Sequence, residues 1–532
     1  MSQISKREVR ERAIERCREK GVLIPTLAQM SDPSTVDPAV RAALAEVDMQ
    51  AVDPLNLFRI SWHNDPETGG FGPVNTLEFP PELTGVEARI VGLVGKHFPT
   101  GAHKVGAAFG CLAPRLVSGE FDPTRQRAVW PSTGNYCRGG VFDSALLGCQ
   151  SVAILPEGMS RERFHWLQQM EAEIIATPGT ESNVKEIFDA CWEIRNNQPD
   201  AVIFNQFEEF GNYLWHYGVT GPAAESAFHE LALAGPRDGN DGEADEALPF
   251  AGPPHAEPMH AGSRADRAEP RELRFAAWVS ATGSSGTLAA GDYLKSRFPG
   301  SRITAAEALE CPTLLECGYG GHRIEGIGDK HVPWIHDVRN TDLVAAIDDE
   351  ATIRLLRLFN EPAGHSVLAS YGVADDVIHH LSLLGISGIC NLLAAIKTAR
   401  YYELDANDVV MVPLTDSVDL YRTRLTELRK ERGPSTKLGS VVNFERYLLA
   451  TRTAYVKELR FTDRKALHNL KYFTWVEQQH KTAEELDALW SPYFWQDLVA
   501  QLPDWDRRIT EFNRETGVLE QIRSLQDGSE PA

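Results

Sequence analysis

The chain has 532 residues, of which 42% are hydrophobic, and a formal net charge of −22 at pH 7. A chain of this length can bury a large core and can hold several domains, or one large two-lobed enzyme with extensions. The strongly acidic balance argues against partners such as nucleic acid and anionic membrane surfaces, because both select basic patches.

The eight cysteines contain no C-x-x-C pair and no metal-ligand spacing with histidine, which predicts free thiols in a reducing compartment and no metal site. The N-terminus is charged and lacks the apolar run of a signal peptide. No stretch approaches the ~18 apolar residues of a membrane-spanning helix. We therefore expect a soluble, cytoplasmic protein.

The first part of the chain, residues 1–60, is predicted to be a helical extension. Residues 5–48 are charged and amphipathic, with breaks at Pro25 and in the turn at 31–34. Such a pattern favours packing or an oligomer surface over chemistry.

From Gly72 the pattern changes to short β-rich runs that alternate with helical windows, which is typical of an α/β fold with parallel sheets flanked by helices. Strands are expected at 89–94, 128–130, 151–155, 173–176, 201–204, 276–280, 302–306 and 409–413. Helices are expected at 105–112, 161–171, 181–196 and 288–297.

Residues 233–272 are rich in Gly, Pro, Ala and charge, and are predicted to form a disordered surface insertion in a catalytic core that spans 61–432. Residues 433–532 read as a second helical extension. Its tryptophans, at 475, 490, 495 and 505, are expected in a core or a subunit interface.

Lys104 stands between a predicted strand and a predicted helix, with Pro99 and Gly101 shaping the turn. Among small apolar residues, desolvation lowers the pKa of an ammonium and frees the amine to attack a carbonyl. Taken alone, such a lysine is more often an ordinary surface residue, but the polar turns elsewhere in the chain favour a reactive one.

The turn at 283–287 (Gly283, Ser284, Ser285, Gly286, Thr287) follows a predicted strand and opens a predicted helix. Glycines let backbone N–H groups turn toward one point, and the helix N-terminus adds positive potential, so the turn suits a phosphate. It matches neither a P-loop nor a dinucleotide fingerprint. Taken alone, it could equally be an ordinary turn.

Two further polar turns follow strands. Ser132, Thr133, Gly134 and Asn135 could hold a carboxylate, and Thr415 and Ser417 place hydroxyls where ligands bind in open α/β sheets. A lysine amine, a phosphate cradle and a carboxylate loop together fit pyridoxal phosphate, whose aldehyde takes a lysine.

The motifs resemble those of the fold type II (tryptophan synthase β-like) pyridoxal-phosphate enzymes, most of all the cysteine synthase and cystathionine β-synthase group. The resemblance covers roughly Gly72 to Arg432. It is carried by 99–104 (PTGAHK), 132–135 (STGN), 156–163 (PEGMSRER), 173–179 (EIIATPG), 205–207 (NQF), 220–222 (TGP), 283–287 (GSSGT), 311–315 (CPTLL), 322–328 (HRIEGIG) and 385–388 (GISG).

This resemblance implies a two-lobed core with a mobile small lobe at about 125–225, and it assigns roles to residues. Lys104 would hold the cofactor as a Schiff base and act as general base at Cα. The cofactor-binding residues would be Lys104, Asn135 (ring hydroxyl), 283–287 (phosphate) and, at the ring nitrogen, Thr415 or Ser417, with Thr415 slightly favoured. Substrate would be bound by Ser132, Thr133, Gly134 and Gln206.

Tyr136 and Arg138 depart from the family pattern and would narrow or recharge the substrate side. If Arg138 points inward, it offers a fork to a second carboxylate of the substrate. The alternative is an arginine that caps a surface or pairs with acidic residues.

The resemblance implies a lyase or transferase that acts on a small α-amino acid by α,β-elimination or β-replacement through an aminoacrylate. A hydroxyl at the ring nitrogen would weaken the ring as an electron sink and disfavour transamination. One alternative is the β subunit of a thiolase-like complex acting on an amino-keto acid. The other is a catalytically silent regulatory subunit, which Lys104 disfavours. We expect a homodimer or larger homo-oligomer, with the C-terminal region as a possible surface for a partner subunit.

Overall fold

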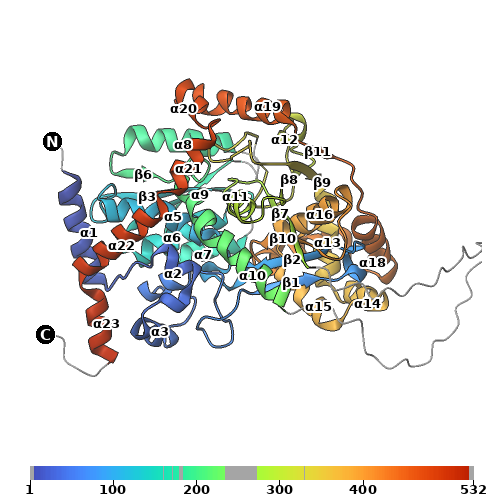
Figure 1. The fold of residues 1–532 in the computed structure, drawn as a ribbon, viewed down its shortest axis with the longest axis horizontal. Helices are drawn as coiled ribbons and strands as arrows, with labels where there is room; N and C mark the ends of the chain where they lie inside the picture. Colours follow the sequence, from blue (N-terminus) through green and yellow to red (C-terminus); the bar gives the residue numbers. More distant parts are fainter. Residues whose placement is uncertain are drawn as a thin grey trace, which may run out of the picture.

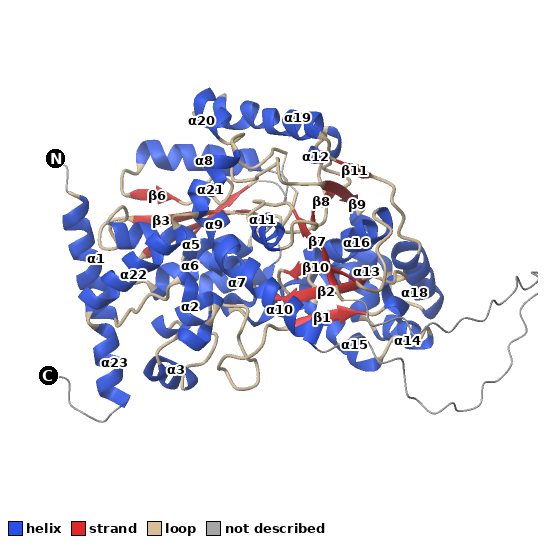
Figure 2. Cartoon of the chain, viewed as in Figure 1, coloured by secondary structure: helices blue, strands red, loops and turns tan. Residues whose placement is uncertain are grey.

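The computed structural model describes residues 5–132, 134–159, 161–170, 172–178, 184–233, 272–328 and 330–526. In this part of the chain two β-sheets form the framework, and helices cover their faces (Figures 1 and 2). The region predicted to be the insertion, 233–272, falls almost entirely outside the described residues, so its prediction stays untested.

The larger sheet has seven strands in the order β1-β2-β10-β7-β8-β9-β11. The inner pairs, from β2 to β9, are parallel, and β1 and β11 add antiparallel edges. The strands are β1 (Thr76–Phe79), β2 (Arg89–Val94), β7 (Arg274–Ala281), β8 (Arg302–Ala308), β9 (Leu343–Ile347), β10 (Asp408–Leu414) and β11 (Val456–Glu458). Every residue of β2, β9 and β10 is buried, as expected for parallel strands covered on both faces.

The smaller sheet has four parallel strands in the order β5-β4-β3-β6. They are β3 (Arg127–Pro131), β4 (Gln150–Pro156), β5 (Glu173–Thr177) and β6 (Ala201–Ile203). All four lie within residues 125–225, the stretch that the sequence assigns to a small lobe.

The α-helices of the core are α4 (Pro81–Thr84), α5 (Lys104–Ser118), α6 (Asn135–Leu146), α7 (Arg161–Gln169), α8 (Val184–Asn197), α9 (Phe210–Trp215), α10 (Gly221–Leu233), α11 (Leu288–Arg297), α12 (Thr313–Glu316), α13 (Asp349–Asn360), α14 (Pro362–Ser370), α15 (Asp375–His380), α16 (Ile386–Tyr401) and α17 (Arg422–Arg432). Those of the extensions are α1 (Lys6–Lys20), α2 (Leu27–Ser31), α3 (Pro38–Ala45), α18 (Lys437–Phe444), α19 (Phe461–Lys471), α20 (Ala483–Ala488), α21 (Pro492–Val499), α22 (Leu502–Thr516) and α23 (Val518–Gln526).

Each predicted strand and helix has a counterpart at its expected place, with ends that differ by a few residues. Three strands were not predicted: β1, β9 and β11. The last corrects the prediction of a purely helical C-terminal region. It forms because residues 456–458 complete the edge of the large sheet by pairing with β9, a long-range contact that leaves no mark in the local pattern.

The N- and C-terminal helical extensions pack against each other, although they lie at opposite ends of the sequence. Arg10 of α1 pairs with Glu515 of α22: its Nη1 and Nη2 each donate to one carboxylate oxygen at 2.8 Å. Asn513 bonds both backbone groups of Ile24. Figure 1 shows α22 and α23 beside α1, with both chain ends on that side.

The C-terminal tryptophans support this packing role: Trp475 and Trp495 are buried, and Trp505 packs against the core.

Within the described ranges, no helix combines the length and apolar character needed to cross a membrane.

Candidate functional site

Lys104 is the first residue of α5, directly after the turn that follows β2, as the sequence predicted. In that turn both Thr100 (φ 68°) and Gly101 (φ 71°) adopt the left-handed conformation, which is ordinary for glycine and uncommon for threonine. The turn brings the Lys104 Nζ within 3.1 Å of the Ser284 Oγ and 3.4 Å of the Gln206 Oε1. The lysine amine therefore faces residues that lie 102 and 180 positions further along the chain.

A cavity opens around this amine at the carboxyl ends of β2, β10 and β7, which are neighbours in the large sheet, and of β3 in the small one. Its lining comprises His103, Lys104, Ser132, Asn135, Tyr136, Gln206, Ala281, Gly283, Ser285, Thr287, Gly326, Ile327, Ser387 and Thr415. Both sheets thus contribute to the cavity, which lies at carboxyl strand ends, where ligands bind in open α/β sheets.

The turn at 283–287 joins β7 to the N-terminus of α11. Ser285 adopts φ 64°, and its buried Oγ has no hydrogen-bond partner. The Asn212 Nδ2 supports the turn by donating to the Ser284 Oγ (2.9 Å) and to the Gln206 carbonyl (3.0 Å). A buried hydroxyl without a partner, at a helix N-terminus, is a feature that an anionic ligand would satisfy.

The hydroxyls of Thr415 and Ser387, which also line the cavity, lie 2.5 Å apart. The backbone N–H and the Nδ1 of His103 both lie within hydrogen-bond distance of the Thr415 carbonyl, 3.1 and 3.2 Å away. Since a carbonyl can only accept, His103 carries its proton on Nδ1. Burial and the nearby Lys104 lower the pKa of His103 to about 3, so this ring is neutral.

Asn135 is held by a buried chain of polar contacts. Its Nδ2 donates to Asp416 (2.6 Å), which also accepts from the Tyr421 hydroxyl (2.7 Å), and Arg163 donates to that hydroxyl (3.2 Å). Arg163 also pairs with Glu325 at 2.5 Å. Burial raises the pKa of Asp416, and Arg163 opposes that shift. The other end of the same amide, the buried acceptor Oδ1, has no partner, and Asn135 lines the cavity.

These residues fit pyridoxal phosphate. The cavity offers an amine for the aldehyde, and the turn at 283–287 offers an unsatisfied buried hydroxyl and a helix N-terminus for the phosphate. It also offers a hydroxyl pair and the unpartnered Asn135 Oδ1 for the polar atoms of a ring. The donor set thus matches the three polar parts of this cofactor.

Most residues predicted from the sequence line this cavity. Among those that the structure describes, the exceptions are Gly134, Ser284, Gly286, Ser417 and Arg138. The first three adjoin lining residues in the chain, and the Ser284 Oγ contacts the Lys104 amine. Ser417 lies away from the lining and caps the 3₁₀ helix Val418–Tyr421, where its Oγ accepts from the Asp419 N–H. Arg138 is buried and absent from the lining. Its guanidinium lies 4.7 Å from the centre of the Trp166 ring, because α6 turns this side chain toward α7. Thr133 lies outside the described residues.

Tyr136 does line the cavity, and its hydroxyl contacts the Cys111 Sγ at 3.5 Å. The glycines that follow it allow α6 to lie against the lysine turn: a Cβ on Gly139 would meet the Val105 Cα at 2.7 Å. A side chain at Gly139 would therefore push α6 away from α5.

Sequence reasoning missed several residues of the site, namely His103, Asn212, Ser387 and Asp416. His103 and Ser387 stand inside the motifs PTGAHK and GISG, so their position in these motifs was an available signal. Asn212 and Asp416 act through other side chains, and no spacing in the sequence marks them.

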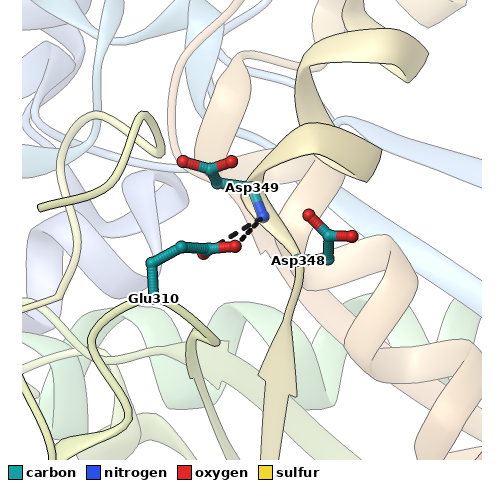
Figure 3. Close-up of side chains that lie close together, drawn as sticks. All are labelled: Glu310, Asp348 and Asp349. Carbon is teal, nitrogen blue, oxygen red and sulfur yellow. Dashed lines mark hydrogen bonds between the residues drawn. The ribbon is translucent and has the colours of Figure 1, made fainter. Parts of the chain in front are cut away.

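Glu310, Asp348 and Asp349 form a cluster with the spacing of a cation site (Figure 3), but each of these carboxylates already has a hydrogen-bond or ion-pair partner. Glu310 accepts from the Asp349 N–H, Asp348 caps α13, and Asp349 pairs with Arg323. We therefore assign the cluster to helix capping.

No family model matches the sequence. Among curated proteins, the chain is 23% identical over 376 residues to a cystathionine β-synthase of Saccharomyces cerevisiae, covering 69% of this chain and 63% of the yeast protein. It is 24% identical over 324 residues to a probable cysteine synthase of Bacillus subtilis, covering 61% of this chain and 85% of that protein. The chain thus spans a little under two thirds of the yeast protein and most of the bacterial one.

Among solved structures, a hydrogen sulfide-producing enzyme of Fusobacterium nucleatum, crystallised with an α-aminoacrylate intermediate, superposes with a TM-score of 0.51 at 20% identity. The match covers 72% of this chain and 93% of that one. The similarity shows that the two chains share a fold.

Proposed function

The chain is a fold type II pyridoxal-phosphate enzyme related to cysteine synthases and cystathionine β-synthases, and we propose that it acts on a small α-amino acid by α,β-elimination or β-replacement. The comparisons with known proteins confirm the predicted family resemblance, fold class and cofactor. The reaction type and the residue roles below are our proposals.

The observation that carries the proposal is the position of the Lys104 amine. It lies 3.1 Å from the Ser284 hydroxyl of the phosphate-type turn and 3.4 Å from Gln206, which also bonds the Ser132 Oγ at 3.2 Å. One amine therefore reaches both the cofactor side and the substrate side of the cavity. A reaction that moves a proton at Cα of a bound amino acid needs this arrangement.

When bound, pyridoxal phosphate supplies an aldehyde that takes up amines and a ring that withdraws electrons from Cα. Lys104 would hold that aldehyde before substrate binds, and its freed amine would accept the proton from Cα of the substrate. Gly283, Ser284, Ser285, Gly286 and Thr287 bind the phosphate. Thr415, supported by Ser387, faces the ring nitrogen, and Asn135 faces the ring hydroxyl. Ser417 serves only as a helix cap.

On the substrate side, Ser132, Thr133, Gly134 and Gln206 hold the substrate carboxylate, and Tyr136 limits the space beside it. Holding the carboxylate fixes the Cα–H bond relative to Lys104. A neutral hydroxyl at the ring nitrogen leaves that nitrogen unprotonated, and this favours departure of a β-substituent over transamination. The neutral, fixed His103 fits this picture because it adds no charge near the ring.

We further propose that residues 61–432 form the catalytic core, with a mobile lobe at about 125–225, flanked by the extensions 1–60 and 433–532. We propose a cytoplasmic homodimer or larger homo-oligomer. Sedimentation velocity tests the assembly, and a monomer at micromolar concentration would contradict it.

The function is tested on the purified holoenzyme. Serine, O-acetylserine, cysteine and an α-amino-β-keto acid are added in turn, each alone and together with a thiol nucleophile (sulfide or homocysteine), and visible absorption, pyruvate, ammonia, sulfide and the new amino acid are followed. Turnover of a β-substituted amino acid supports the proposal. Cleavage of the keto acid alone would favour the thiolase-like alternative, and no turnover of any of them would favour a silent subunit.

The assignment of Lys104 has its own test. Borohydride reduction followed by peptide mapping should place the pyridoxyl label on Lys104, and Lys104→Ala should lose the label and turnover while keeping the fold. Lys96→Ala is the matched control, because Lys96 lies eight positions earlier in the same turn region and pairs with Asp419 instead. A label on another lysine contradicts the assignment.

A further inference from the structure

A second cavity, of about 750 Å³, lies between the catalytic core and the C-terminal extension. One wall comes from the second half of α5, the strand β6 and the start of α9; the other comes from α20 and α22 of the extension. Figure 1 shows α22 running past α5. This volume is in the range of small-molecule sites, which occur preferentially between structural units.

Charges of both signs line this cavity in nearly equal number. The cations are Arg115, Arg195, Lys481 and Arg508, and the anions are Glu120, Glu208, Glu209, Glu485 and Asp504. Phe210, Trp334 and Trp505 add aromatic surface. A polyanion would meet as many carboxylates as cations here, whereas a molecule that carries an ammonium and a carboxylate can match both.

The charges are held in place from both walls. Arg115 pairs with Glu209 at 2.7 Å within the core, and Lys481 of the extension reaches across to Glu208 at 2.9 Å. Burial raises the pKa of Glu209 to about 7, and Arg115 opposes that shift. These pairs are only partly buried, so a ligand can reach them from the cavity and exchange charged partners with them.

One short segment connects this cavity to the catalytic one. Gln206 lines the catalytic cavity, whereas the residues at 208–211 line the second cavity. Asn212 follows at once and bonds both the Gln206 carbonyl and the Ser284 Oγ. A second link runs through Cys111, which lines the second cavity and contacts the hydroxyl of Tyr136 in the first.

We propose that the second cavity binds a small zwitterionic metabolite of the α-amino acid class and that this ligand modulates the catalytic cavity through residues 206–212. Its ammonium meets Glu208 and Glu209, its carboxylate meets Arg115 and its neighbouring cations, and the aromatic side chains contact its side chain. The site is separate from the substrate pocket, and its ligand is an effector.

The binding test uses holoenzyme that has been reduced with borohydride, so that amino acids can no longer react with the cofactor. The twenty proteinogenic L-amino acids are titrated calorimetrically and by tryptophan fluorescence, which Trp334 and Trp505 report. At least one should bind. Its N-acetyl and amide derivatives, which each lack one charge, should bind at least about tenfold more weakly. Equal binding of either derivative, or no binding by any amino acid, overturns the proposal.

Location is tested by filling the cavity. Gln501→Trp places an indole in the lining from an exposed position at the start of α22, and should weaken binding at least about tenfold with basal turnover unchanged. Gln496→Trp, the same change at an exposed position outside the lining, is the matched control. If the two variants bind alike, the ligand sits elsewhere.

Coupling between the two cavities is measured by the fluorescence of the reduced cofactor. This fluorescence should change with ligand concentration along the same saturation curve as the binding signal. Binding without that change would overturn the proposed modulation. The binding test does not depend on which reaction the enzyme catalyses, so its failure and a failure of the proposed function are distinguishable.

Discussion

A methyl group at Gly286 should impair cofactor binding through Asn212. A Cβ built on Gly286 would lie 2.1 Å from the Asn212 Oδ1 and 2.6 Å from its Cγ. These distances are far below van der Waals contact, so in Gly286→Ala the amide must move. Asn212 has little freedom to do so, because it is fully buried.

The expected loss of cofactor affinity follows from the hydrogen bonds that the Asn212 amide makes. Its Nδ2 donates to the Ser284 Oγ at 2.9 Å and to the Gln206 carbonyl at 3.0 Å. Leaving a buried polar group unsatisfied costs about 1–3 kcal/mol, and Ser284 belongs to the turn that we propose binds the phosphate. If about 1.4–2.8 kcal/mol of this appears in binding, cofactor affinity falls roughly ten- to a hundredfold.

The assay is titration of the apoenzyme with pyridoxal phosphate, followed by absorption and by quenching of tryptophan fluorescence. Gly300→Ala is the matched control, because a Cβ there meets nothing within 4 Å. Asn212→Ala removes the same hydrogen bonds without the clash and should weaken the cofactor in the same direction. Wild-type affinity in both Gly286→Ala and Asn212→Ala would refute the reasoning.

Three further predictions concern buried charge and hydrogen bonding. The pKa of Lys471 is lowered to about 7 by burial, against 10.5 in the unfolded chain. The unfolded state therefore binds an extra proton between these values, and stability should rise with pH through this window by at most roughly 1.4 kcal/mol per unit. Urea unfolding at several pH values should show stability rising more steeply with pH in the wild type than in Lys471→Met, because buried Lys397, whose pKa is lowered to about 8, contributes a slope of the same sign in both proteins. Tyr421→Phe removes a hydroxyl that bonds both Asp416 and Arg163, and should cost about 1–3 kcal/mol in urea unfolding; an unchanged midpoint contradicts this. Arg138→Ala should change the spectroscopically titrated affinities of aspartate-like and serine-like ligands by the same factor, because Arg138 does not line the cavity; a selective loss for the dianion contradicts this.

The sequence predicts the lysine and the phosphate-type turn well, because both lie within short segments whose local pattern sets their geometry. The apolar strand before Lys104 and the small residues after it place the amine at a strand-to-helix junction, where it is found. The same holds for the turn between β7 and α11.

The choice between Thr415 and Ser417 depends on long-range contacts. Both hydroxyls follow β10 within a few residues, and the local sequence favours neither strongly. The backbone of Ala102 forms a bridge to Asp416, and His103 bonds the Thr415 carbonyl, so the lysine turn fixes which hydroxyl enters the cavity.

Arg138 shows a different limit of prediction from the sequence. Its distance from the carboxylate loop allows its side chain to point inward or outward, and α6 is buried almost all round, so no polar face reveals its orientation. Trp166, which stacks on it, lies on α7, beyond β4. A residue whose environment is built by a later helix cannot be oriented from its own neighbourhood in the sequence.

The arrangement of the site suggests how binding of cofactor and substrate are divided between the lobes. Lys104, the turn at 283–287 and Thr415 follow β2, β7 and β10, which are adjacent strands of one sheet. Ser132 follows β3 of the other sheet. A movement of the small lobe would therefore leave the proposed cofactor contacts of the large sheet intact and change the grip on the substrate carboxylate. Asn135 is the exception, since Asp416 ties it to the large sheet, so it is the residue through which such a movement would reach the cofactor ring.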